Sequence, residues 1–105
     1  MENNNNIKAL FIIVNAGFST EVVEIARDAG AKGATIMNAR GKGKLHETFM
    51  GITIDTEKEI ILSLIDGDIV DSVIAAIKAK SGRGHLANSV CFTMPVEKST
   101  MINFF

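Results

Sequence analysis

The stretch Ile7–Asn15, IKALFIIVN, is the longest nearly continuous apolar segment of the chain. Its nine residues are rich in β-branched side chains, and Gly17 follows closely. A run of this length and composition is typical of a strand that is covered on both faces or that lies at a subunit contact. It is far shorter than the roughly 20 residues of a membrane-spanning helix. We therefore expect Ile7–Asn15 to be a central strand.

The segments that follow this strand alternate between helical and extended patterns. Ser19 or Thr20 is expected to cap a helix, because apolar residues then recur at helical spacing as far as Gly30. A short extended run, Ala34–Ala39, is the next predicted strand. Thr48–Ile54, TFMGITI, is expected to form another β-rich segment.

The second half of the chain repeats the pattern. Asp55–Lys58 is expected to be a turn before the apolar strand Glu59–Ile65, EIILSLI. Asp66–Asp68 is expected to cap a second helix, whose apolar positions begin at Ile69 and whose last turn holds two lysines. The last predicted strand is Ser89–Val96, in which Pro95 limits further pairing.

Without the β-rich segment Thr48–Ile54, the four strands and two helices follow in the order β-α-β-β-α-β. This order predicts an α+β fold of the ferredoxin-like type, with two helices on one face of an antiparallel sheet. No helix remains to cover the second face. Since the strands are too apolar to leave that face in water, self-association is the simplest expectation.

The composition places limits on the class of protein. The 105 residues suit one domain, which we expect to span 7–105 behind a disordered tail at 1–6 that lacks the pattern of a signal peptide. A net charge of −1 argues against a nucleic-acid partner, and no segment favours membrane insertion. The single Cys91 cannot form an internal disulfide, so a cytoplasmic location is expected.

Two glycine-rich basic loops are the main candidates for ligand binding. Arg40-Gly41-Lys42-Gly43-Lys44 follows the second predicted strand, and Ser81-Gly82-Arg83-Gly84-His85 follows the second helix. Glycines let backbone amides approach a ligand, and interleaved cations favour phosphate over a neutral group. The alternative for the first loop is a solvated hairpin whose charges serve solubility.

The order and spacing of short motifs in this chain resemble those of the P-II (nitrogen regulatory) signal-transduction proteins over most of residues 7–96. The motifs that carry the resemblance are Gly33-Ala34-Thr35-Ile36, Arg40-Gly41-Lys42-Gly43, Lys58-Glu59-Ile60-Ile61, Asp68-Ile69-Val70-Asp71, and the glycine loop and strand that end at Pro95-Val96. The resemblance implies a homotrimer that binds ATP or ADP in the clefts between subunits. It also implies a signalling role, in which a flexible loop after the second strand docks on a transporter, an enzyme or a regulator.

The resemblance also assigns nucleotide-binding positions. Gly33 and Thr35 are expected to meet the base of a nucleotide from the neighbouring subunit, and the loop from Arg83 to Ser89 to surround the phosphates. The full expected set is Gly33, Thr35, Arg40, Gly41, Lys42, Gly43, Leu64, Arg83, Gly84, His85, Leu86, Ala87, Asn88 and Ser89.

Departures from the family pattern bear on the ligand. The flexible loop, expected between Arg40 and Phe49, is several residues shorter than in most members. Leu45 stands where a Gln would hold a magnesium–2-oxoglutarate complex, and Val90 where a Lys would close the phosphate loop. The arginine pair beyond the last strand has no counterpart, and the chain has no Tyr to be modified. These departures argue against 2-oxoglutarate and predict modest nucleotide affinity.

A nucleotide-sensing regulator is the favoured function. The alternative is a P-II-shaped module that has lost nucleotide binding and acts through another small ligand or a protein partner only. An enzyme is not expected, because no nucleophile–base pair is evident. No required cofactor and no metal site are expected, since His46-Glu47 is a weak metal motif and the three carboxylates Asp66, Asp68 and Asp71 suit a helix cap and a helix face better.

Overall fold

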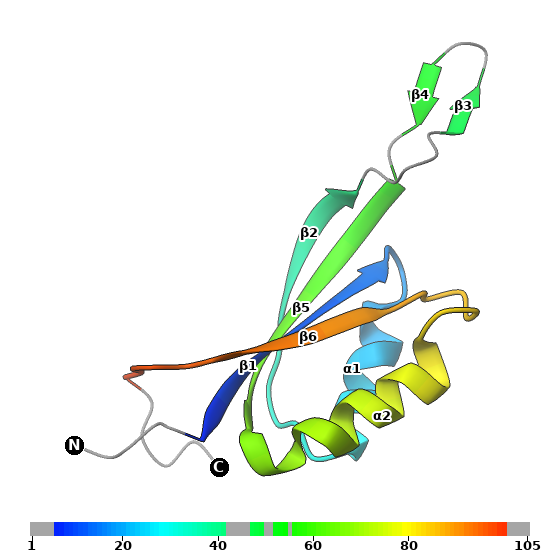
Figure 1. Cartoon of the computed structure of the whole chain (residues 1–105). Coiled ribbons are helices and arrows are strands. Elements are labelled where there is room, and N and C mark those ends of the chain that lie inside the picture. Colours follow the sequence, from blue (N-terminus) through cyan, green and yellow to red (C-terminus); the bar gives the residue numbers. More distant parts are fainter. Residues whose placement is uncertain (1–5, 42–46, 50–51, 55, 101–105) are drawn as a thin grey trace.

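The structure, a computed structural model, describes residues 6–41, 47–49, 52–54 and 56–100. Its main elements are β1 (Ile7–Asn15), α1 (Ser19–Asp28), β2 (Thr35–Gly41), β5 (Thr56–Asp66), α2 (Val70–Ser81) and β6 (Val90–Pro95). A short hairpin, β3 (Glu47–Phe49) with β4 (Ile52–Ile54), lies beyond the ends of β2 and β5, and the 3-10 turn η1 (Gly67–Ile69) precedes α2 (Figure 1).

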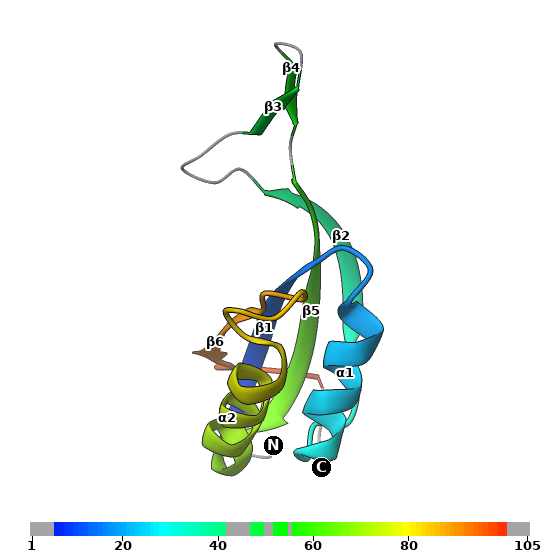
Figure 2. The same cartoon turned by 90° about the vertical axis from the view of Figure 1, so that its right-hand side faces the viewer.

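The main sheet has four strands in the order β2-β5-β1-β6, and each neighbouring pair is antiparallel. The central strand is β1, in which Ile12 lies between Ile61 of β5 and Cys91 of β6. Both helices pack on the same side of this sheet (Figures 1 and 2). The α+β fold with an antiparallel sheet and two helices, predicted from the sequence, is therefore confirmed.

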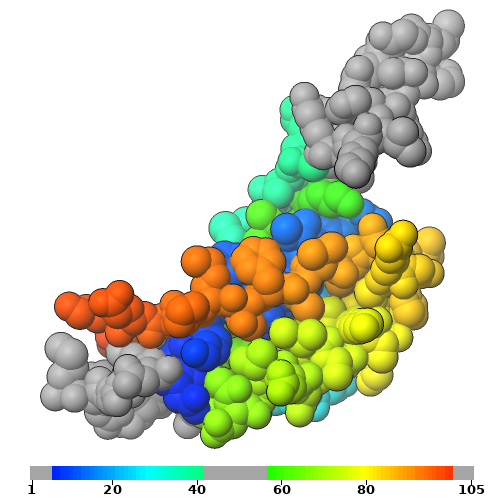
Figure 3. All heavy atoms as spheres, in the orientation of Figure 1, coloured from blue at the N-terminus to red at the C-terminus, as the bar shows by residue number. Residues whose placement is uncertain are grey.

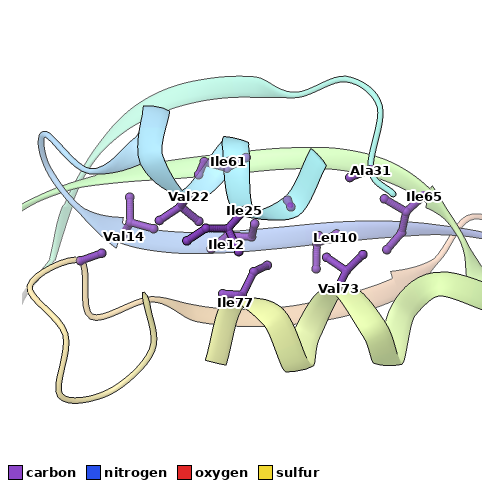
Figure 4. Close-up of a cluster of buried hydrophobic side chains, with 12 residues drawn as sticks. Leu10, Ile12, Val14, Val22, Ile25, Ala31, Ile61, Ile65, Val73 and Ile77 are labelled. Carbon is purple, nitrogen blue, oxygen red and sulfur yellow. The ribbon is translucent and has the colours of Figure 1, made fainter. Parts of the chain in front are cut away.

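The hydrophobic core lies between the sheet and the two helices (Figure 4). Because side chains alternate along a strand, every second residue of β1 points into this layer. Leu10, Ile12 and Val14 are each 0% exposed, and they pack with residues of both helices and of β5. The other large members of the core are Val22, Ile25, Ile61, Ile65, Val73 and Ile77.

The opposite face of the sheet is also apolar, but no helix covers it. The residues that alternate with the core residues are Ala9, Phe11 and Ile13 of β1, Ile60, Leu62 and Leu64 of β5, Met37 of β2, and Val90, Phe92 and Met94 of β6. We call this set the open face. Phe92 is 44% and Val90 59% exposed although both are apolar, and β6 lies at the surface of the molecule (Figure 3).

Several predicted boundaries differ from the structure. The expected turn at Asp55–Lys58 is wrong for Thr56–Lys58, because β5 begins at Thr56 and pairs with β2 as far as Gly41. The segment Thr48–Ile54 is divided between β3 and β4, which pair with each other. The strand predicted at Ala34–Ala39 occupies Thr35–Gly41, so Arg40 and Gly41 belong to a strand rather than a loop. The last strand is Val90–Pro95, one residue shorter at each end than Ser89–Val96.

The capping of the two helices also differs from the prediction. Ser19 and Thr20 are not caps, because Phe18 is the N-cap residue and no side chain caps α1. The Ser19 hydroxyl donates instead to Glu59 Oε2 across 3.1 Å. The cap predicted at Asp66–Asp68 for the second helix caps the 3-10 turn η1 instead, because the Asp66 side chain accepts a hydrogen bond from the Asp68 amide at 2.8 Å. The N-cap residue of α2 itself is Ile69, and no side chain caps it.

Ser63 fastens the segment before β2 to the sheet. Its hydroxyl, on a residue that is 4% exposed, donates to the Gly33 carbonyl oxygen at 2.6 Å. Ser63→Ala is expected to lower the free energy of unfolding by about 1–3 kcal/mol, because it leaves this carbonyl without its partner. Urea unfolding measures the change, and Ser72→Ala on the exposed side of α2 is the control. Equal midpoints for the two variants would contradict this role of Ser63.

Among the described residues, no helix has the length and apolar character needed to cross a bilayer.

Candidate functional site

One end of the sheet gathers most of the candidate binding residues. β1 and β2 finish at this end, and β5 and β6 begin there. Arg40 and Gly41 therefore lie close to Lys58, and a Cβ added to Gly41 would stand 3.3 Å from Lys58 Cγ. The α2–β6 loop reaches the same end, since Asn15 N donates to the Ala87 carbonyl oxygen at 2.9 Å. Arg40 and Gly41 thus lie at the same end of the subunit as the α2–β6 loop.

The α2–β6 loop, residues 82–89, consists of two successive turns. His85 N donates to the Gly82 carbonyl at 3.1 Å, and Asn88 N donates to the His85 carbonyl at 3.0 Å. Gly84 has φ +97° at the third position of the first turn, a conformation that favours glycine. Within the part of the chain that the structure describes, no hydrogen bond occupies the amides at the middle of the two turns, those of Arg83, Gly84, Leu86 and Ala87. Arg83, Gly84 and Leu86 are exposed, and amides exposed on a turn can line an anion site.

The base of the same loop is fixed by buried serines. Ser89 N donates to the Ser81 carbonyl at 2.8 Å, and the two hydroxyls are 3.1 Å apart. Ser81 Oγ donates in turn to the Ile77 carbonyl. Ala87 is only 3% exposed and belongs to the core. Of the predicted binding residues, Ala87 and Ser89 therefore face inward, whereas Arg83, Gly84, His85, Leu86 and Asn88 are exposed.

A hollow of about 610 Å³ lies beside the loop between β1 and α1. It is lined by Ala16, Gly17, Asn38, Ala39, Arg40, Glu57, Lys58 and Glu59. Arg40 faces Glu57 in the β2–β5 register, and opposite charges at such positions attract. Glu59 binds the β1–α1 turn, because its Oε1 accepts from Gly17 N at 2.7 Å while its Oε2 accepts from Ser19. The hollow therefore combines two cations, Arg40 and Lys58, with two carboxylates, and the Glu59 carboxylate holds the β1–α1 turn.

A second, smaller hollow of about 240 Å³ lies beyond the α2–β6 loop. It is lined by Phe18, Glu21, Lys80, His85, Leu86 and Ala87. Leu86 is 80% exposed at its rim.

The remaining predicted residues lie elsewhere. Gly33, Thr35 and Leu64 lie toward the opposite end of the sheet, since Thr35 begins β2 and Leu64 pairs with Ala9 near the start of β1. A strand rises about 3.3 Å per residue, so the seven residues of β2 separate Thr35 from Gly41 by about 20 Å. One subunit therefore does not bring these two groups together. Lys42, Gly43 and Leu45 lie outside the described residues.

The described residues offer little for metal or covalent chemistry. Among them, no group of three His, Cys, Asp or Glu side chains is placed to hold a metal ion. Cys91 points to the helix side of β6, where it packs against the core. Burial raises the pKa of its thiol, which keeps it in the unreactive protonated form.

The sequence matches the family model described as nitrogen regulatory protein P-II over residues 7–103. The chain belongs to the P-II family. No curated protein matches it significantly.

Solved structures of P-II-like proteins share the fold of this family member. One is CPII, a nitrogen regulatory PII-like protein from Thiomonas intermedia K12 bound to ADP, AMP and bicarbonate. Its TM-score is 0.69 at 18% sequence identity, and the match covers 91% of this chain and 96% of that one. Another is a PII-like signalling protein from Thermus thermophilus, with a TM-score of 0.66 at 17% identity and 86% coverage of each chain.

Three residues of this site did not enter the predicted binding set. Asn15 joins the α2–β6 loop to β5, Lys58 bonds to Asn15, and Glu59 holds the β1–α1 turn. The sequence does hold a signal for two of them, because Lys58-Glu59 opens one of the family motifs. Asn15 gives no such signal beyond its place at the end of an apolar strand.

Proposed function

We propose that this P-II protein is a homotrimeric sensor of adenine nucleotides, with ADP or ATP as the ligand, that regulates a partner protein such as a transporter or a metabolic enzyme. The observation that carries the proposal is the α2–β6 loop, whose exposed residues Arg83, Gly84 and Leu86 have amides without a hydrogen bond among the described residues, at the same end of the sheet as Arg40 and Lys58. Open amides and nearby cations suit a di- or triphosphate. The presence of ADP and AMP in the structure of CPII supports the same ligand class.

The trimer would supply the rest of the nucleotide site. Gly33, Thr35 and Leu64 lie about 20 Å from the phosphate end of their own subunit, so a nucleotide would meet them only on a neighbour. A Cβ on Gly33 would meet no atom within 4 Å in the subunit, so the fold alone does not require glycine there. Close approach of an adenine base from outside would give a reason for it.

Titration calorimetry with ADP, ATP and AMP tests the proposal. Arg83→Ala is expected to weaken ADP or ATP binding by about ten- to a hundredfold, the equivalent of one charge-assisted hydrogen bond, and to reduce its salt dependence. Arg40→Ala is expected to act in the same direction. Lys98→Ala is the control, because this exposed lysine lies beyond the end of β6.

Absence of heat and of a thermal shift with all three nucleotides at millimolar concentration would rule the nucleotide proposal out. The module would then act through another small ligand or through a protein partner only.

A further inference from the structure

Asn15, the last residue of β1, hydrogen-bonds to three separate parts of the chain. Its side-chain Nδ2 donates to the Leu86 carbonyl oxygen at 2.8 Å, and its backbone N donates to the Ala87 carbonyl at 2.9 Å. Its Oδ1 accepts from Lys58 Nζ at 2.6 Å, and its carbonyl accepts from Phe18 N at 3.2 Å. This half-buried residue therefore touches the α2–β6 loop, β5 and the β1–α1 turn.

The contacts continue from Lys58 to the end of β2. The Lys58 side chain lies against Gly41, where an added Cβ would stand 3.3 Å from Cγ and 3.4 Å from Cε. Gly41 is the last residue of β2, and the basic segment Lys42–Lys44 follows it in the sequence. A continuous series of contacts therefore runs from Gly41 through Lys58 and Asn15 to Leu86 and Ala87.

We propose that Asn15 is the positioning residue that joins the end of β2, at Arg40 and Gly41, and the α2–β6 loop into one anion-binding unit. Its side chain holds the Lys58 ammonium with one atom and the loop at residues 86–87 with another. This inference rests on the proposed function for the identity of the ligand, but the linkage itself exists without ligand.

The chemistry of an amide explains why asparagine suits this position. The Leu86 carbonyl needs a donor and the Lys58 ammonium needs an acceptor, and a short side-chain amide carries both on one planar group. An aspartate would keep the Lys58 contact and strengthen it by charge. It would also place a second acceptor oxygen against the Leu86 carbonyl, so the loop would lose its bond and meet repulsion. An alanine would release both partners.

Amide hydrogen exchange of the unliganded protein tests the linkage. Asn88 N and Ser89 N are the reporters, because Asn88 N bonds to His85 within the loop that Asn15 holds and Ser89 N bonds to Ser81 at the base of that loop. Asn15→Asp and Asn15→Ala are each expected to speed exchange at these two amides by about tenfold through local opening. Asn38→Asp is the matched control, since it adds the same charge to the neighbouring part of β2. Among the described residues, the Asn38 side chain makes no hydrogen bond to the α2–β6 loop.

ADP titration separates positioning from a general loss of structure. Both Asn15 variants are expected to bind ADP about tenfold more weakly than the wild type. Only Asn15→Asp is expected to lower the salt dependence of binding, because its carboxylate neutralises Lys58 whereas the alanine leaves that cation available.

Exchange at Asn88 and Ser89 within twofold of the wild-type rate in both variants would overturn the inference. Failure of wild-type protein to bind any of ADP, ATP and AMP would instead refute the proposed nucleotide function, and the exchange result would still decide whether Asn15 holds the loop.

Discussion

Phe11→Asp is expected to convert the proposed trimer into monomers. Phe11 lies on β1 in the middle of the open face, and its ring stacks on Phe92 with centroids 5.2 Å apart and planes at 14°. Leu62 is its neighbour on β5. If the open faces of three subunits pack together, a carboxylate at this position would be buried without a partner, which costs several kcal/mol. Light scattering after size-exclusion chromatography at micromolar concentration gives the mass.

Two further variants distinguish loss of the assembly from loss of the fold. Ile61→Asp, on the next strand, is expected to unfold the chain rather than dissociate it, because Ile61 is 1% exposed and belongs to the core between sheet and helices. Thr20→Asp on the exposed side of α1 is expected to change neither mass nor fold. A wild-type monomer, or a Phe11→Asp variant with the full trimer mass, would refute the proposed assembly.

Gly82→Ala is expected to destabilise the protein and to move the α2–β6 loop. An added Cβ would stand 2.6 Å from the Lys78 carbonyl oxygen and 3.1 Å from its Cα. These are backbone atoms of α2, which cannot turn aside as a flexible side chain would. We expect a loss of about 1–3 kcal/mol in the free energy of unfolding, as for other overpacked sites. Urea unfolding and amide exchange across residues 83–89 measure the two effects.

Gly33→Ala is the matched comparison, because the new Cβ meets nothing within 4 Å in the subunit. Its unfolding midpoint is expected to equal that of the wild type. If Gly82→Ala were as stable as Gly33→Ala and kept wild-type exchange in the loop, the close packing of Gly82 on α2 would not restrict the loop.

Much of the fold could be predicted from the sequence because its signals are local. The length and β-branched content of apolar runs such as IKALFIIVN, with the helical spacing after Thr20, are enough to indicate the order of the elements. The capping role of Asp66 could be predicted for the same reason, since its partner Asp68 is only two residues away, although the element that it caps is η1 and not α2.

The features that could not be predicted depend on contacts between distant segments. Ser19 looks like a cap in sequence, but its partner Glu59 lies 40 residues further on. Glu57 and Lys58 look like a turn because they are charged, yet β2 pairs with them and extends the strand. The role of Asn15 depends on Lys58, 43 residues away, and on Leu86, 71 residues away. Candidate glycines and cations could therefore be named from sequence, but not the hydrogen bonds that hold them.

The most direct test of the central claim is native mass spectrometry of the wild-type protein with ADP or ATP. We expect a trimer of the 11.3 kDa chain that binds as many as one nucleotide in each cleft between subunits. The bound nucleotide is expected to dissociate as the ammonium acetate concentration rises, because cations hold the phosphates. A monomer, or a trimer that takes up neither nucleotide at millimolar concentration, would contradict the account.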